Sequence, residues 1–190
     1  VPFRLGPLLR NGKPPWFPRG EDLPKPVFVF DPSGSRTSTW HQGGLDANGP
    51  YDRRTFSPKV PKIAVICQAR AQGQVEQWLA QFLEGVPSPS SGGQRGSAGP
   101  YEKGFVRRYN LQDAKTKVFT TPTADAKGYL AACRRPVDAT TGRGARWDLA
   151  FVQTDDAFHA LAGDDNPYLV TKAFLLKLGV QVQAITLETM

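Results

Sequence analysis

The chain has 190 residues, of which 39% are hydrophobic and 22% are charged, with 17 prolines and 19 glycines. This composition is typical of a globular chain and excludes membrane-spanning, collagen-like and wholly disordered proteins. The length allows one domain of about 130 to 150 residues plus an attached segment. The net charge of +7 favours anionic partners, above all nucleic acid.

The cysteines and the lack of long apolar segments indicate the cellular setting. Cys67 and Cys133 fit neither a disulfide framework nor a zinc site in number or spacing. No stretch approaches the roughly 20 apolar residues of a membrane helix, and the first residues lack a secretory signal pattern. We therefore expect a reduced, cytoplasmic protein with no membrane partner. We also expect a fragment of a longer protein, because the chain stops directly after an apolar run.

Residues 1–57 hold more than half of the prolines. Because proline fixes φ and removes a backbone donor, we expect no helix here and only short edge strands. Residues 27–30 are the one expected strand, and 31–34 and 47–50 are expected turns. We interpret the segment as an irregular, proline-rich linker laid over a neighbouring domain.

From residue 58 onward, strand-like and helix-like segments alternate. Residues 62–67 form a short apolar run rich in β-branched residues, which is typical of a strand buried in a parallel sheet. Further strands are expected at 104–109, 117–120, 147–152 and 182–187, helices at 75–83, 124–134 and 167–178, and loops at 87–100 and 142–144. We expect Pro136 to end the second helix. This order predicts an α/β fold for residues 58–190, a Rossmann-like three-layer sandwich around a mainly parallel sheet.

The sequence lacks the common catalytic patterns. His41 and His159 lie far apart, and neither belongs to a recognised metal-ligand motif. No nucleophile elbow, Walker-type loop or dinucleotide-binding pattern follows the expected strands. The acidic pairs at 155–156 and 164–165 could cap helices as readily as bind a metal. We therefore expect no catalytic centre, no metal and no cofactor within this chain.

The start of the helix expected at 167–178 is the best candidate binding site. Asn166 is a suitable N-cap and Pro167 a suitable first helical residue, which places Tyr168 and Lys172 on one face, four residues apart. A helix N-terminus offers free backbone N–H groups and the positive end of the helix dipole. A phenol and an ammonium beside it would form a phosphate cradle.

The surroundings of Lys172 leave two readings. The rest of the helix is apolar on nearly all sides and should be buried, so the lysine would need a partner. Alternatively, Lys172 extends its long stem to the surface. Gln183 favours the first reading, because its carboxamide lies in an apolar strand and could reach the same anion from the sheet.

These residues resemble a motif of the Argonaute family, in particular the MID domain of prokaryotic Argonautes. That motif anchors the 5′-phosphate of a guide strand with an aromatic or basic residue, a lysine, a glutamine and a second lysine. Tyr168, Lys172 and Gln183 match the first three positions. The resemblance also covers residues 49–52, Phe56 and the strands at 62–67 and 147–152, and thus spans roughly residues 45–190.

The resemblance implies a MID-like domain at 58–190 that binds the 5′-phosphorylated end of a single-stranded guide RNA or DNA. The guide would pair with a target strand in silencing or in defence against foreign nucleic acid. Two parts of the family pattern are missing. The second lysine is absent from the chain, and so is the PIWI domain, the expected partner that carries the nuclease carboxylates. Mg²⁺ at the guide phosphate is expected only in the full-length protein.

The resemblance also suggests further contacts. The loop after the 147–152 strand would lie near the first guide base, with Thr154 and Asp155 as candidates, although Asp155 could simply cap a short helix. Arg70, Arg107 and Arg108, with Lys103 nearby, could bind later phosphates, although charge clusters are often solvated faces. Two other functions stay open: a Rossmann-like binder of a phosphorylated small molecule or nucleotide, and a structural domain that docks an acidic protein.

Overall fold

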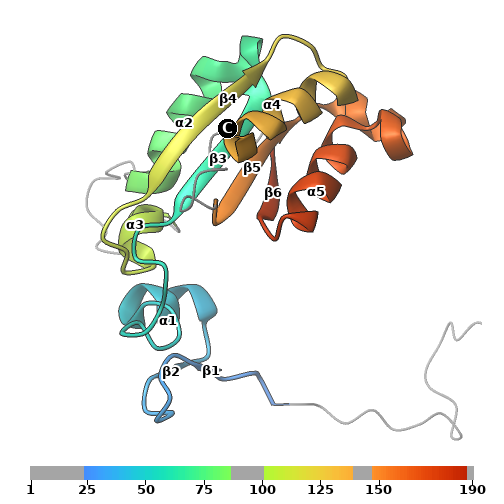
Figure 1. The fold of residues 1–190 in the computed structure, drawn as a ribbon. Helices are drawn as coiled ribbons and strands as arrows, with labels where there is room; N and C mark the ends of the chain where they lie inside the picture. Colours follow the sequence, from blue (N-terminus) through green and yellow to red (C-terminus); the bar gives the residue numbers. More distant parts are fainter. Residues whose placement is uncertain (1–23, 87–100, 139–146, 188–190) are drawn as a thin grey trace, which may run out of the picture.

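The computed structural model describes residues 24–86, 101–138 and 147–187 (Figure 1). Its centre is a parallel sheet of β4 (Lys115–Thr121), β3 (Lys62–Gln68), β5 (Leu149–Thr154) and β6 (Gln181–Thr186), hydrogen-bonded in that order. Four of the expected strands are thereby confirmed, with ends shifted by one or two residues. The loops expected at 87–100 and 142–144 lie outside the described residues.

Helices cover both faces of this sheet. On one face, α4 (Ala126–Asp138) and α5 (Pro167–Lys177) enclose one half of the core with Ala64, Ile66 and Val152. On the other face, α2 (Gln72–Glu84) packs over Ile63 and Val65. All residues of β3 after Lys62 are buried, as expected for a central parallel strand. The fold is therefore the expected Rossmann-like three-layer α/β sandwich.

The chain order creates a switch point between β3 and β5. From β3 the chain passes through α2 to β4 on one side, whereas β5 lies on the other side of β3 and leads into α5. The helices after β3 and β5 lie on opposite faces of the sheet. In open α/β sheets, ligands bind outside the carboxyl ends of the strands at such a point. Two short 3₁₀ helices, η1 (Ala69–Ala71) and η2 (Asp156–Ala160), begin there.

Two expectations for the domain are wrong. The strand expected at 104–109 is the helix α3 (Gly104–Arg108), in which the Tyr109 N–H donates to the Phe105 carbonyl at 3.1 Å. Phe105 stacks on Phe82 of α2 with ring centroids 4.8 Å apart, so packing on a helix decides its conformation. Pro136 does not end α4 but lies within it, fully buried. The proline removes one backbone donor, and burial of its ring offsets that loss.

The linker segment is more ordered than its prolines suggest. β1 (Phe28–Val29) pairs with β2 (Thr37–Ser38) in an antiparallel hairpin. The expected turn after β1 is confirmed, since the Gly34 N–H donates to the Asp31 carbonyl at 3.1 Å. The exclusion of helices is wrong, because α1 (His41–Asn48) follows β2. Residues 33–49 contain no proline, so the steric argument does not apply to them.

Candidate functional site

Asn166 organises the start of α5, as expected of an N-cap. Its Oδ1 accepts from the Tyr168 and Leu169 N–H groups at 3.0 and 3.1 Å. The Val170 N–H donates to the Asn166 carbonyl at 3.2 Å, and Pro167 has no N–H. The expected free backbone donors are therefore already used within the helix. An anion at this end would meet the helix dipole and side chains instead.

Tyr168 and Lys172 are brought together on α5. The Lys172 Nζ lies 5.4 Å from the centroid of the Tyr168 ring, within the range of a cation–π contact. Both side chains are half-buried, and Tyr168 packs against the core on the α4 and α5 face. Within the described residues, no carboxylate lies within ion-pair distance of this ammonium. The pair therefore presents a positive charge that is not neutralised by a described neighbour.

The rest of α5 is less buried than expected. Only Pro167, Thr171 and Leu175 are buried in the helix, whereas Leu169 and Leu176 are 45% and 43% exposed. The expectation of full burial is wrong because α5 lies in an outer layer and only one of its faces meets the sheet.

Gln183 is not brought to Tyr168 and Lys172. It lies on the edge strand β6 in register with Phe151 of β5, and residues in register on parallel strands point to the same face. Phe151 packs against Trp78 of α2, with ring centroids 5.1 Å apart. The Gln183 side chain is exposed on the α2 side of the sheet, where its Nε2 donates to the Ala184 carbonyl at 3.2 Å. Gln183 therefore lies on the opposite face of the sheet from the α5 pair, and its contact with a phosphate stays a prediction.

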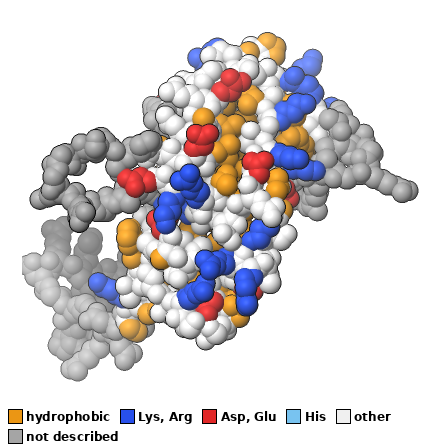
Figure 2. Space-filling view, turned by 90° about the vertical axis from the view of Figure 1, so that its left-hand side faces the viewer, with side chains coloured by type: hydrophobic (Ala, Val, Ile, Leu, Met, Phe, Trp, Pro, Cys, Tyr) orange, Lys and Arg blue, Asp and Glu red, His pale blue; other side chains and the backbone are white. Residues whose placement is uncertain are grey.

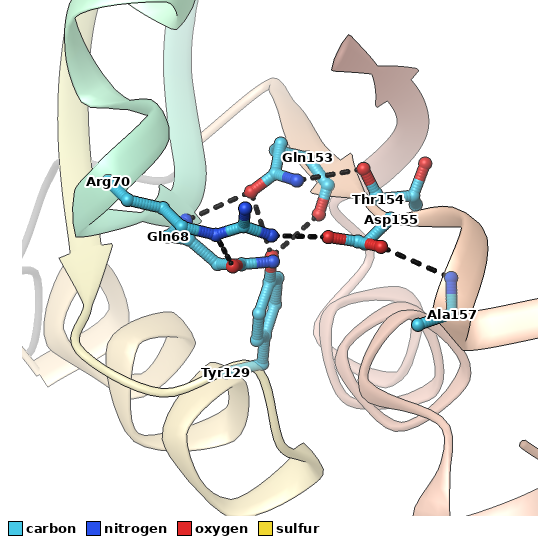
Figure 3. Close-up of polar contacts among 7 residues, drawn as sticks. All are labelled: Gln68, Arg70, Tyr129, Gln153, Thr154, Asp155 and Ala157. Atoms are coloured by element: carbon cyan, nitrogen blue, oxygen red, sulfur yellow. Dashed lines mark hydrogen bonds and ion pairs between the residues drawn. The ribbon is translucent and has the colours of Figure 1, made fainter.

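A polar cluster occupies the switch point between β3 and β5 (Figure 3). We call Gln68, Arg70, Tyr129, Gln153 and Asp155 the switch-point network. The Gln153 Oε1 accepts from the Gln68 backbone N–H at 3.0 Å, and the Tyr129 hydroxyl donates to the Gln153 carbonyl at 2.9 Å. The Arg70 Nε donates to the Gln68 Oε1 at 2.7 Å, and its Nη2 lies 2.5 Å from the Asp155 Oδ2. Burial raises the pKa of the Tyr129 phenol well above its usual range, so the hydroxyl remains a donor.

Thr154 and Asp155, the candidates for base contact, lie at the edge of this network. The Thr154 Oγ1 donates to the Ile185 carbonyl of β6 at 3.3 Å. Asp155 caps η2, since its Oδ1 accepts from the Ala157 N–H at 3.1 Å. The capping alternative for Asp155 is thus confirmed, and a role in base contact stays a prediction. Sequence reasoning missed Gln68, Tyr129 and Gln153 as members of a network, although Gln68 is the last residue of buried strand β3 and Gln153 the last but one of β5.

A comparison with known proteins shows what this chain is related to. No family model matches the chain. The chain is 33% identical over 172 residues to a protein named "Protein argonaute" from Cereibacter sphaeroides. The chain is a homologue of part of an argonaute protein. The match covers 87% of this chain and 21% of the Cereibacter sphaeroides protein. This chain therefore spans about a fifth of the length of its relative.

The basic residues of α3 lie apart from the α5 pair in this argonaute homologue. Figure 1 places α3 at the opposite end of the sheet from the carboxyl ends of the strands. Arg108 is buried there, and its Nε lies 2.8 Å from the Asp46 Oδ1 of α1. The Lys103 Nζ donates to the Asp46 carbonyl at 2.7 Å, whereas Arg107 is exposed. Arg108 and Lys103 therefore attach the linker segment to the domain, and Arg107 is the one of the three without a described link to Asp46.

Three further findings concern the surface charges, the possible metal ligands and the length of the helices. On the face in Figure 2, Lys and Arg side chains are interspersed with Asp and Glu instead of forming one continuous basic surface. Among the described residues, no group of three or more His, Cys, Asp or Glu side chains could hold a metal ion. Within the same residues, no helix is long and apolar enough to cross a membrane.

Proposed function

We propose that this chain binds the 5′-phosphorylated end of a single-stranded guide, RNA or DNA, as the MID-like part of a prokaryotic argonaute. The observation that carries the proposal is the Tyr168 and Lys172 pair at the capped start of α5, in a chain homologous to an argonaute. The guide's remaining bases would stay free to pair with a target strand in silencing or defence.

The chemistry of the pair suits a terminal phosphate. The Lys172 ammonium can neutralise one phosphate charge, and the Tyr168 hydroxyl can donate a hydrogen bond to a phosphate oxygen. The positive end of the α5 dipole adds to the same attraction. Asn166 holds the start of the helix through both oxygen and nitrogen of its carboxamide, so the two side chains are presented from a fixed backbone.

The described residues do not fit a Mg²⁺ ion at this place. Magnesium prefers carboxylate and other oxygen ligands, whereas the pair consists of a phenol and an ammonium. Mg²⁺ at the guide phosphate is therefore a proposal for a longer protein that includes a PIWI domain. Recognition without catalysis, in the cytoplasm, is our proposal for this part.

The deciding experiment compares two oligonucleotides that differ only at the 5′ end. We expect the phosphorylated strand to bind more tightly than its hydroxyl twin by about 1 to 2 kcal/mol, the scale of one charge-assisted hydrogen bond. Fluorescence anisotropy at one salt concentration measures both affinities. Lys172→Ala should reduce the preference with little change in Tm, because the Tyr168 hydroxyl remains and alanine favours helices.

Lys177→Ala is the matched control, since Lys177 is exposed in the last turn of the same helix. It should keep the preference for the 5′-phosphate. Equal binding of the two strands by the unmodified chain would refute the proposal. If a phosphorylated mononucleotide bound as tightly as the oligonucleotide, and binding hardly changed with salt, the small-molecule alternative would be favoured instead.

A further inference from the structure

The segment between β5 and α5 is fastened at both ends. We call residues 155–166 the β5–α5 loop. At its start, Asp155 pairs with Arg70 and caps η2. At its end, the Asn166 Nδ2 donates to the Phe158 and Leu161 carbonyls at 2.8 and 3.1 Å. The loop therefore has a defined shape, although its residues Asp156, Ala157 and 159–161 are exposed.

Tyr129 connects this loop to the core. Its hydroxyl donates to Gln153, the residue two before Asp155. Its ring meets the ring of Phe158, which belongs to the loop, edge to face at a centroid distance of 5.4 Å. Both side chains are buried. One residue of α4 thus contacts the end of β5 through a hydrogen bond and the loop through its ring.

The amides of the switch-point network are occupied by one another. The Gln68 Oε1 accepts from Arg70, and its Nε2 donates to the Tyr129 hydroxyl at 3.4 Å. The Gln153 Oε1 accepts from the Gln68 backbone N–H, and its Nε2 donates to the Thr154 carbonyl at 2.8 Å. Since each amide oxygen and nitrogen has a partner in the network or next to it, these side chains hold the ends of β3 and β5 together.

Arg70 is the member that links the network to the loop. Its guanidinium donates from Nε to Gln68 on β3 and from Nη2 to Asp155 on the loop. A planar guanidinium can serve two acceptors in a fixed geometry, which a lysine ammonium cannot reproduce. The Arg70 side chain is 66% exposed and the Asp155 side chain 23%. The contact therefore lies where the loop meets solvent.

We propose that Arg70 is a positioning residue. It fixes the β5–α5 loop and thereby sets which first base of a 5′-phosphorylated strand is accepted beside α5. This inference rests on the proposed function. It gives Arg70 a role other than the binding of later phosphates, since its guanidinium bridges Gln68 and Asp155 through Nε and Nη2.

The experiment compares the unmodified chain with Arg70→Ala, and uses Arg107→Ala as the control that removes an exposed arginine elsewhere. Hydrogen exchange of the backbone amides at 154–161, without nucleic acid, reports the order of the loop. We expect Arg70→Ala to speed this exchange by about tenfold, and Arg107→Ala to leave it unchanged. Arg70→Lys should resemble Arg70→Ala, whereas Asp155→Asn should be intermediate, because its single amide oxygen can keep only one of the two contacts that Asp155 accepts, from Arg70 or from the Ala157 N–H.

Binding of four 5′-phosphorylated strands that differ in the first base supplies the second measurement. We expect the unmodified chain to prefer one base, and Arg70→Ala to reduce that preference by about fivefold or more. The preference for 5′-phosphate over 5′-hydroxyl should stay unchanged. The slope of log affinity against log salt concentration should also stay unchanged. Loss of one phosphate contact would make this negative slope shallower by about 0.7.

The results separate the possible failures. Unchanged exchange in Arg70→Ala would overturn the positioning role. Faster exchange with an intact base preference, an unmodified chain with no base preference, or a lower salt slope would overturn the role in base choice. If the unmodified chain did not distinguish 5′-phosphate from 5′-hydroxyl, the proposed function would fail. The exchange measurement would still decide whether Arg70 positions the loop.

Discussion

Tyr168 combines two chemical groups whose contributions can be separated. Its hydroxyl is the donor that we assign to the phosphate, and its ring faces the Lys172 ammonium and packs against the core. An aromatic ring can also stack on an unpaired base, which is common in the recognition of single strands. Tyr168 thus contacts the core and the Lys172 ammonium, and we propose that it also contacts the guide strand.

Substitution of Tyr168 tests these contributions. Tyr168→Phe keeps the ring and should weaken binding of a 5′-phosphorylated strand by about 0.5 to 1 kcal/mol, because it removes one of the two side-chain contacts that together give the phosphate preference. Tyr168→Ala should lose about 1 to 3 kcal/mol more, because stacking is removed as well. Titrations with both variants and with Tyr51→Phe, which changes an exposed tyrosine of the linker segment, measure these losses. Equal losses for Phe and Ala would rule out stacking, and no loss for either would make Tyr168 a core residue only.

At the scale of elements, local sequence patterns predict some features of the fold and miss others. The run 62–67 is apolar throughout, and β3 is buried on both faces as that pattern indicates. Residues 104–109 allow a strand or a helix, and contact with Phe82 of α2 selects the helix. For α5, composition indicates burial, but composition does not show that the helix has a second face toward solvent. The helix at 104–109 and the partial burial of α5 both depend on which elements pack together in the fold.

One buried group of α5 leads to a stability prediction. The Thr171 hydroxyl is fully buried and has no hydrogen-bond partner among the described residues. Because an unpaired buried hydroxyl is costly, Thr171→Val should raise the free energy of unfolding by about 1 kcal/mol. Urea denaturation measures the change. Thr171→Ser, which keeps the hydroxyl and removes a methyl group, should not stabilise the chain, and destabilisation by valine would show that the hydroxyl has a partner after all.

At the scale of the molecule, long-range pairs join parts that the sequence presents separately. Arg108 and Asp46 are 62 positions apart, and Arg70 and Asp155 are 85 positions apart. Charge and composition identify these residues as polar or basic, but they do not show that each faces an internal carboxylate. The α5 pair was predictable because its two members are one helical turn apart, whereas the switch-point network required the strand order.

The ion pair between Arg108 and Asp46 joins the linker segment to the domain, and its contribution to stability can be measured. Asp46→Ala should lower the free energy of unfolding by about 2 to 3 kcal/mol, because the ion pair between the Asp46 carboxylate and buried Arg108 is lost. Asp164→Ala, which removes an exposed carboxylate of η3 (Gly163–Asp165), is the control and should have little effect. The two denaturation curves provide the comparison. Similar stabilities of both variants would mean that the contact with α1 adds little to the domain.

The position of β3 at the centre of the four-stranded sheet also affects the order of folding during synthesis. During synthesis from the N-terminus, β3 emerges first among the sheet strands, with apolar side chains on both faces. One neighbour, β4, follows after α2 and α3, and the other, β5, only after α4 as well. Parallel pairing over such separations is intrinsically slow. On the ribosome, β3 therefore lacks a strand partner until α2, α3 and β4 have been made, and its apolar side chains stay exposed to aggregation until then.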